Sequence, residues 1–294
     1  MSAQHLPMEM NINSATELFG VIGYPLGHSL SPLMHNEAFH ELAINALYLA
    51  WAVSPENLPK VVDAAKTLNV RGFNVTIPFK EKIISYLDGI SDEAAACGAV
   101  NTVKITNGQA WGYNTDGPGF LASLQEREVQ IGGMALVLGA GGAARAIGYE
   151  LAKAGYETAF VDIVPEKAAT LATDIKRLTG SPAAGVVWNS SELTAVTERA
   201  ALIVNASPVG MYPNVQNMPP LDLNGLTPGA VVCDIVYNPI KTRLLLEAEA
   251  LGIKTVEGLG MFINQGAIAF KIFTGVDAPV KVMENAVRKS LKRN

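Results

Sequence analysis

The chain has few cysteines and few histidines. Only two of its 294 residues are cysteines, Cys97 and Cys233, and they stand far apart without the spacing of metal ligands. Two thiols in a chain of this length suit a reducing compartment, and we expect a cytoplasmic protein. Only four histidines occur, and no pair at helical spacing is joined by a carboxylate ligand, so we expect no metal.

Long apolar runs, basic clusters and a signal sequence are also missing. Mean hydropathy is +0.22, but no apolar run approaches the ~18 residues that span a bilayer. Net charge is −5 without a Lys/Arg cluster, so we expect neither a nucleic-acid nor a membrane partner. Residues 1–15 lack the basic start and apolar core of a signal peptide and are interpreted as a loose leader. With 49% hydrophobic residues, the chain is long enough for two folded domains.

The first third of the chain alternates strand and helix patterns. Asn107-Gly108 between two β-rich runs predicts a tight hairpin. Ser31 before Pro32 is typical of a helix start. The predicted elements are a strand at 17–24, a helix at 31–43, a strand at 46–53, a helix at 55–68, a strand at 71–77, a helical stretch around 81–97, and two strands within 99–106 and 109–114.

After Asp116 the pattern changes to apolar strands separated by helix-length segments. The strands are 134–138, 157–162, 200–205 and 230–236. Such spacing predicts a parallel sheet covered by helices, and therefore an α/β fold with a Rossmann-like, doubly wound domain. Two further helical segments follow from Gly258, and we expect this tail to pack back onto the N-terminal part.

The segment 139–144 has the G-x-G-x-x-A form of a dinucleotide-binding loop. Gly139 allows a tight turn, Gly141 lets the backbone approach a pyrophosphate, and Ala144 keeps the following helix close to the sheet. That helix, from Gly142 to Ala154, directs free N–H groups at the phosphates. The alternative is a plain strand-to-helix turn, and a flavin site or a bare Rossmann domain is also left open. The flanking strands favour a nicotinamide dinucleotide, and hence a dehydrogenase. The expected cofactor residues here are Gly139, Ala140, Gly141, Gly142, Ala143 and Asp162.

Asp162 bears on the choice of cofactor. It ends the second strand, 21 residues after Gly141, where an acid binds the ribose hydroxyls. A carboxylate at this position accepts a hydrogen bond from a ribose 2′-hydroxyl and repels a 2′-phosphate. The next residues offer no arginine, and Lys167 is interpreted as a solvated lysine. We therefore expect NAD, with NADP as the alternative.

Polar residues gather at strand ends in the N-terminal half. Ser29 and Ser31 precede a helix and are suited to hold a carboxylate, although Ser31 alone would be interpreted as a helix cap. Asn74, Thr76 and Lys80 lie around the end of a predicted strand, and a lone lysine is most often on the surface. Asp116 has a second interpretation as a helix N-cap.

Together these segments resemble the shikimate dehydrogenase family. The matching motifs are SLSP (29–32), NVTIPFK (74–80), GAVNT (98–102), NTDG (114–117), GAGGAA (139–144), NASPVGM (205–211) and GLGMFINQG (258–266), in the family's order. The resemblance implies a two-domain enzyme with a cleft between the domains. It implies a substrate-binding catalytic domain at 1–116 plus 257–294 and a dinucleotide-binding domain at 117–256. The implied reaction is reversible hydride transfer between shikimate and 3-dehydroshikimate in aromatic amino acid biosynthesis.

The resemblance also implies roles for individual residues. Lys80 and Asp116 look like the catalytic pair. The remaining substrate-binding residues would be Ser29, Ser31 and Tyr237 at the carboxylate, and Thr76, Asn101 and Gln265, with Asp116, at the hydroxyls. The nicotinamide end would be bordered by Asn205, Ser207, Ile235, Gly258 and Met261.

One segment departs from the common family pattern. Many members that use NADP carry Asn-Arg-Thr where this chain has Asp162-Ile163-Val164. This opens the NAD-linked quinate/shikimate branch, which acts in quinate catabolism, as an alternative. A dehydrogenase for another cyclic polyol acid and a non-catalytic metabolite-sensing relative are further alternatives. The presence of Lys80 and Asp116 argues against the last. Oligomeric state is left as monomer or homodimer.

Overall fold

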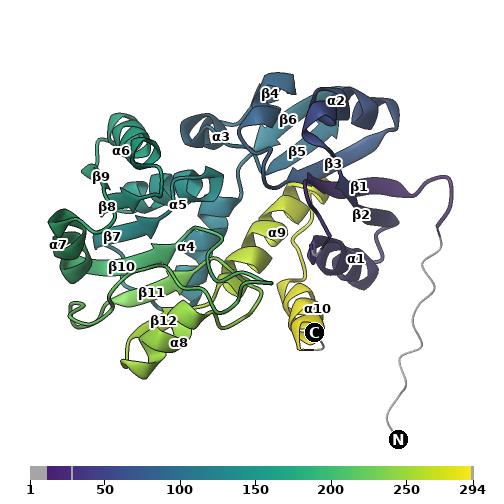
Figure 1. The fold of residues 1–294 in the computed structure, drawn as a ribbon. Coiled ribbons are helices and arrows are strands. Elements are labelled where there is room, and N and C mark those ends of the chain that lie inside the picture. Colours follow the sequence, from purple (N-terminus) through teal and green to yellow (C-terminus); the bar gives the residue numbers. More distant parts are fainter. Residues whose placement is uncertain (1–11, 28, 293–294) are drawn as a thin grey trace, which may run out of the picture. The chain divides into compact units, whose positions relative to one another are not determined.

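The computed structural model describes residues 12–27 and 29–292, and the chain divides into two compact units (Figure 1). Unit 1 comprises the described residues up to 90, residues 100–112 and the described residues from 266 onward. Unit 2 comprises residues 91–99 and 113–265. Each unit has its own six-stranded sheet, and each is described by itself. Residues 1–15, which we interpret as a loose leader, lie largely outside the described residues.

Unit 1 is built on a mixed sheet with the strand order β2-β1-β3-β5-β6-β4. Strand β1 pairs in parallel with β2 and β3, whereas β3 pairs antiparallel with β5. The hairpin predicted at Asn107-Gly108 is confirmed, because both residues have positive φ (52° and 74°) between β5 and β6. The strands are β1 (Glu17–Gly23), β2 (Ala46–Ala52), β3 (Val70–Val75), β4 (Gly89–Ile90), β5 (Thr102–Thr106) and β6 (Gln109–Tyr113).

Aromatic side chains fill the core between this sheet and its helices. Phe19 of β1 lies 5.5 Å from Phe39 and 5.2 Å from Phe273, measured between ring centroids. Gly72 of β3 leaves room for Phe273, since a Cβ there would lie 2.7 Å from its ring. The C-terminal tail thus contributes to the core of unit 1. The helical segments are α1 (Ser31–Glu41), η1 (Pro55–Asn57), α2 (Leu58–Thr67), η2 (Lys82–Tyr86), the end of α9 (Gly258–Thr274) and α10 (Val280–Leu291).

Unit 2 contains the predicted parallel sheet, with the order β12-β11-β10-β7-β8-β9. The strand order reverses between β7 and β10, which is where doubly wound sheets bind ligands. The predicted α/β fold is confirmed. The strands are β7 (Gly133–Leu138), β8 (Tyr156–Val161), β9 (Ala183–Val186), β10 (Ala200–Asn205), β11 (Val231–Asp234) and β12 (Lys254–Val256).

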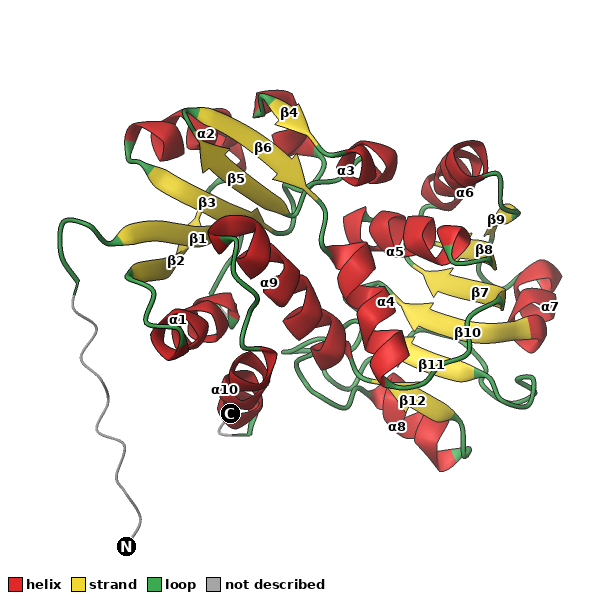
Figure 2. Ribbon diagram, turned by 180° about the vertical axis from the view of Figure 1, so that it is seen from behind, coloured by secondary structure: helices red, strands yellow, loops and turns green. Residues whose placement is uncertain are grey.

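Helices cover both faces of the unit 2 sheet, which explains its unbroken apolar strands (Figure 2). Alternate residues of β7 point to opposite faces: Val137 packs with α5 and α6, and Leu136 packs with α7 and α8. Gly148 brings α5 close to β8, since a Cβ there would lie 2.5 Å from Phe160. The helices are α3 (Asp92–Cys97), α4 (Asp116–Glu126), α5 (Gly142–Lys153), α6 (Pro165–Thr179), α7 (Ser191–Arg199), α8 (Arg243–Ala250) and the start of α9.

One local prediction was wrong, and two short strands were missed. The helical stretch expected around 81–97 is interrupted, because η2 is followed by the short strand β4 before α3 begins at Asp92. The edge strands β9 and β12, of four and three residues, were not predicted, because such short strands carry too little periodicity to recognise.

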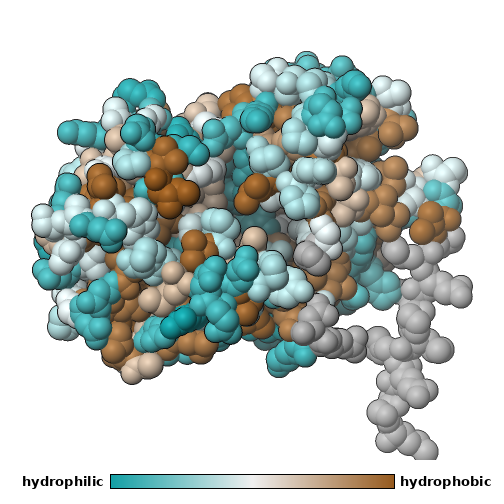
Figure 3. Space-filling model, in the orientation of Figure 1, coloured by the Kyte–Doolittle hydropathy of each residue, from teal (hydrophilic) through white to brown (hydrophobic). Residues whose placement is uncertain are grey.

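The described surface carries both polar and apolar residues. Hydrophilic and hydrophobic residues are intermixed over the face shown in Figure 3. Within the described residues, no helix has both the length and the apolar character needed to cross a membrane.

Candidate active site

The glycine loop joins β7 to α5 at the carboxyl edge of the unit 2 sheet. Gly139 has φ +112°, a conformation that favours glycine, and its N–H donates to the carbonyl of Val161 at 2.7 Å. Gly141 precedes the first turn of α5, and a Cβ built there would meet no described atom within 4 Å. The loop therefore leaves open space in front of the free N–H groups of a twelve-residue helix. This is the arrangement that accommodates a pyrophosphate.

Asp162 follows β8 and lies against this loop. One carboxylate oxygen accepts from the backbone N–H of Ala140 at 2.8 Å, and the other accepts from Val164 N–H at 3.0 Å. A carboxylate has about four lone-pair positions, so two backbone donors leave it able to accept from ribose hydroxyls. The adjoining side chain of Ile163 is 89% exposed and carries no charge.

A buried carboxylate at the end of β11 was not singled out from the sequence. Asp234 is 2% exposed, and its Oδ1 accepts from Asn205 Nδ2 at 3.0 Å and from Val236 N–H at 2.9 Å. Its Oδ2 accepts from the hydroxyl of Thr242 at 2.7 Å. Burial raises the pKa of Asp234 to about 6, even though all three donors oppose the shift. The only signal in the sequence was one acid within the apolar run 230–236.

The hydrogen bond between Asp234 and Asn205 stabilises the loop after β10, where two predicted cofactor residues lie. Asn205 is fully buried, and its amide nitrogen also donates to the carbonyl of Val209 at 3.1 Å. The Asn205 oxygen accepts from the Ser207 hydroxyl at 2.6 Å. Both ends of the Asn205 amide are therefore held, and the loop is fixed at its start.

The remaining predicted cofactor residues reach the same edge of the unit 2 sheet. The N–H of Ile235 donates to the carbonyl of Asn205 at 3.0 Å, next to the end of β10. Gly258 begins α9 against this strand end, since a Cβ there would lie 2.5 Å from the backbone of Ile235. Met261, one turn later, is buried in the core cluster that includes Val137. Tertiary folding thus gathers the predicted cofactor set around four adjacent strands.

In unit 1, the polar segments named from the sequence also meet at one sheet edge. Strands β1 and β3 run in parallel, so their carboxyl ends share an edge, and β5 begins there because it runs the other way. The N–H of Thr76 donates to Ile22, and the N–H of Tyr24 donates to Ile77, which ties the segment after β1 to the segment after β3. The carbonyl of Lys80 accepts from Val100 N–H at 2.8 Å. Lys80 and Asn101 are therefore brought together from separate motifs.

The serine pair sits at the start of α1, but not as a conventional cap. The N-cap residue is Leu30, and Ser31 is the first helical residue. Interpretation of Ser31 as the capping residue was therefore wrong. Instead, the hydroxyl of Ser29 accepts from the N–H of Ser31 at 3.3 Å. Ser31 is buried, and Ser29 is half-buried.

Three predicted substrate residues belong to unit 2. Asp116 is buried and is the first residue of α4, following the N-cap Thr115, so its interpretation as the N-cap was also wrong. Its N–H donates to the side-chain oxygen of Asn114 at 3.0 Å. Tyr237 stacks on Phe262, with 4.2 Å between ring centroids. The amide nitrogen of Gln265 donates to the Phe262 carbonyl at 2.8 Å.

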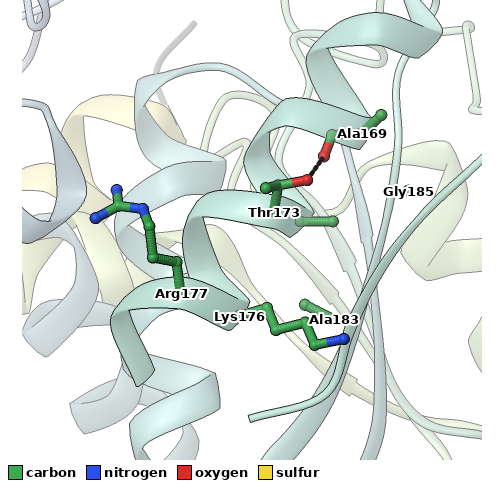
Figure 4. A pocket seen from close by; sticks show the side chains of 7 residues that line it. Ala169, Thr173, Lys176, Arg177, Ala183 and Gly185 are labelled. Carbon is green, nitrogen blue, oxygen red and sulfur yellow. Dashed lines mark hydrogen bonds between the residues drawn. The ribbon is translucent and has the colours of Figure 1, made fainter. Parts of the chain in front are cut away.

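A groove of about 600 Å³ between α6 and β9 contains none of these residues. Its walls combine small residues with Lys176 and Arg177, and Gly185 lets β9 approach the backbone of α6 at Ala169 (Figure 4). The Thr173 hydroxyl donates to the Ala169 carbonyl at 2.9 Å. Lys176 extends along β9 and Arg177 points away from it (Figure 4). Among the described residues, no group of three or more His, Cys, Asp or Glu side chains is placed to hold a metal ion.

Two family models match this chain. Residues 21–103 match the shikimate dehydrogenase substrate binding domain, and residues 258–288 match the shikimate 5′-dehydrogenase C-terminal domain. The shikimate dehydrogenase (NADP(+)) of Syntrophomonas wolfei is 44% identical over 287 residues, which cover 97% of this chain and 98% of that protein. This chain belongs to the shikimate dehydrogenase family. The predicted resemblance is thus confirmed.

Solved structures of the shikimate dehydrogenase family share this fold. A shikimate dehydrogenase in complex with NADP+ has a TM-score of 0.89 and 42% identity, with 95% of this chain and 97% of that one covered. The Listeria monocytogenes enzyme, in complex with shikimate and NAD, has a TM-score of 0.87 and 37% identity over 94% and 98%. A Corynebacterium glutamicum quinate dehydrogenase in complex with NAD has a TM-score of 0.85 and 32% identity over 93% and 99%.

Proposed function

We propose that this protein catalyses reversible hydride transfer between a nicotinamide dinucleotide and the shikimate/3-dehydroshikimate pair, in the pathway to aromatic amino acids. The observation that carries the proposal is that three polar segments reach one edge of the unit 1 sheet in a member of this family. The segment after β1 leads to Ser29 and Ser31, the segment after β3 holds Thr76 and Lys80, and Asn101 directly precedes β5. These side chains offer hydroxyl, amide and ammonium groups, which suit a hydroxylated carboxylic acid. We assign residues 1–116 and 257–294 to substrate binding and residues 117–256 to dinucleotide binding.

The nicotinamide, when bound, accepts or supplies the hydride. Reduction of the ketone places negative charge on its oxygen, and a proton must reach that oxygen as the hydride arrives. We assign Lys80 to stabilise this charge and deliver the proton, and to accept a proton in the reverse direction. We assign Asp116 to orient the substrate hydroxyls. Ser29 and Ser31, helped by Tyr237, hold the carboxylate, and Thr76, Asn101 and Gln265 hold hydroxyls.

We propose NAD as the preferred dinucleotide, although several relatives of this chain are named for NADP(+). Asp162 supports this choice because two backbone N–H groups hold its carboxylate beside the glycine loop. A 2′-phosphate bound there would meet a fixed negative charge, whereas a 2′-hydroxyl would meet an acceptor. No arginine follows within residues 163–167 to bind a phosphate.

Steady-state kinetics with shikimate and quinate, each with NAD and NADP, test substrate and cofactor together. The proposal expects the highest kcat/KM with shikimate and NAD. Absence of turnover with either acid would refute the assignment to this reaction. A clear preference for NADP would refute the cofactor assignment alone.

Asp162→Asn removes the negative charge while keeping the shape of the side chain. Loss of this charge should shift the NAD-to-NADP ratio of kcat/KM toward NADP by roughly 10-fold or more, since like-charge repulsion costs at least about 1.4 kcal/mol. Asp222→Asn is a matched control, because Asp222 is an exposed acid of unit 2 that also accepts from a local backbone N–H, at 2.9 Å. The control should leave the ratio unchanged. An unchanged ratio in Asp162→Asn would remove Asp162 from cofactor selection.

Quinate dehydrogenation is a second candidate function, favoured by the combination of Asp162 with the likeness to an NAD-bound quinate dehydrogenase. Higher kcat/KM for quinate than for shikimate would establish quinate dehydrogenation as the function.

We propose a cytoplasmic location for the protein. Two cysteines that are free and buried support this location.

A further inference from the structure

A chain of buried polar side chains runs through unit 1 behind the candidate substrate residues. The hydroxyl of Tyr48, on β2, donates to Asn74 Oδ1 on β3 at 2.6 Å. Asn74 Nδ2 donates to Thr102 Oγ1 at 2.9 Å, and the Thr102 hydroxyl donates to Asn101 Oδ1 at 3.0 Å. All four residues are at least 92% buried, so these hydrogen bonds have little competition from solvent.

The direction of this chain is determined by one backbone carbonyl. The carbonyl of Asn101 accepts from Val75 N–H at 2.8 Å and from Asn74 Nδ2 at 3.1 Å. A carbonyl only accepts, so the amino end of the Asn74 amide must face it, and Asn74 Oδ1 must face Tyr48. Tyr48 is therefore the donor. Thr102 already accepts from Asn74, and it directs its single proton to Asn101.

Tyr48 is held rigidly in this donor role. The ring of His35 stacks on the Tyr48 ring at 4.3 Å with an interplanar angle of 4°. The Asn36 side chain bonds both the N–H and the carbonyl of Tyr48, at 2.8 and 2.9 Å. Burial raises the pKa of Tyr48 well above 10 and lowers the pKa of His35 to about 3. Tyr48 thus keeps its proton, and His35 stays neutral, across the working pH range.

We propose that Tyr48 is a positioning residue for the substrate: through Asn74 and Thr102 it fixes the orientation of the Asn101 amide. The Asn101 oxygen faces Thr102, so its amino group is the end that donates to a substrate hydroxyl. The proposal rests on the proposed function, which assigns Asn101 to hydroxyl binding. It adds that the donor character of Asn101 is determined by a tyrosine three hydrogen bonds away.

The test compares Tyr48→Phe with Thr102→Val and Thr102→Ser. Loss of the Tyr48 hydroxyl leaves Asn74 Oδ1 buried without its donor, and loss of the Thr102 hydroxyl breaks the chain directly. The KM for shikimate should rise roughly 3- to 10-fold in Tyr48→Phe and in Thr102→Val, with a smaller change in kcat and an unchanged KM for the dinucleotide. Thr102→Ser keeps a hydroxyl and should restore a KM close to that of the parent protein.

Tyr156→Phe is the matched control for the loss of a buried hydroxyl. Tyr156 is 1% exposed in unit 2, and its hydroxyl donates to the Gln130 carbonyl at 2.9 Å, unconnected to Asn101 by these bonds. Its KM for shikimate should not change. If the control raises KM as much as Tyr48→Phe does, the effect is general destabilisation and the proposal is refuted.

Substrate analogues provide a readout that a structural role would not affect. Shikimate analogues that each lack one non-reacting hydroxyl should show the same penalty in Tyr48→Phe, except for the analogue that lacks the hydroxyl bound by Asn101. For that analogue the penalty should disappear. An equal penalty for every analogue would overturn the proposal.

Asn101→Ala distinguishes failure of this proposal from failure of the proposed function. If the parent protein turns over shikimate and Asn101→Ala raises its KM while Tyr48→Phe does not, the positioning role is refuted and the function stands. If Asn101→Ala has no effect, Asn101 does not bind substrate, and the proposal is refuted together with that assignment.

Discussion

Replacing Asp234 with asparagine should remove a pH-dependent component of stability. The carboxylate is 2% exposed and accepts from Asn205, Val236 and Thr242. Asparagine has the same shape, and its oxygen can accept from Asn205 and Val236. Its amino group can then donate to Thr242, whose hydroxyl is able to reverse its direction. The substitution therefore removes the titrating group while preserving the contacts.

The magnitude follows from the raised pKa of Asp234. Its pKa is about 6 in the folded protein against an ordinary value of 3.8, and the leading cause is burial. A difference of about two units corresponds to about 3 kcal/mol between the two protonation states. Below pH ~3.8 the group is protonated in both folded and unfolded chains. As pH rises toward ~6 the unfolded chain loses its proton first, so the folded state loses stability until both are ionised.

Urea unfolding of both proteins between about pH 4 and pH 8 measures this effect. The free energy of unfolding of the parent protein, minus that of Asp234→Asn, should fall by up to about 3 kcal/mol as pH rises through 6, and then stay constant. Cys233 does not contribute over this range, because burial raises the pKa of its thiol. A difference that is independent of pH, or that grows as pH rises, would refute the reasoning.

Three further substitutions test the candidate site and its packing. Lys80→Ala should lower kcat by roughly 100-fold or more with a smaller change in substrate binding, and near-normal turnover in steady-state assays would remove Lys80 from the mechanism. Ser29→Ala should raise the KM for shikimate, because the hydroxyl at the start of α1 is assigned to its carboxylate; an unchanged KM would leave Ser29 only its contact with Ser31. Gly119→Ala should lower stability by about 1–3 kcal/mol in thermal or urea unfolding, because the new Cβ would lie 2.6 Å from the backbone nitrogen of Gln265. Parent-like stability would show that α4 and α9 can separate without cost.

The sequence by itself determined the parallel sheet of unit 2 and the glycine loop. Both depend on local information: apolar runs for strands buried on both faces, and glycines where the backbone turns or must remain open. Gly139 has positive φ, and Gly141 faces open space, as their places in the motif predict. The hairpin at Asn107-Gly108 was equally local.

Tertiary structure decided which polar residues act together. Lys80 and Asn101 are 21 residues apart in the chain, and the hydrogen bond between Lys80 and Val100 brings their segments together. Tyr48 is unremarkable in the sequence, because a tyrosine in a strand is usually core, whereas Asn74 stands out only as a polar residue near a predicted strand end. Only the pairing of β2, β1 and β3 shows that the two side chains meet.

Tertiary structure also decided the surroundings of Asp234 and the residues at which α1 and α4 begin. One acid in an apolar run carries no local sign that three donors from separate segments converge on it. Ser31 and Asp116 have the residue types of helix caps, yet each is the first residue inside its helix. Residue type and periodicity determine which elements form, because they act over a few residues. Burial, hydrogen-bond direction and pKa depend on neighbours distant in the chain, and only the folded structure supplies those.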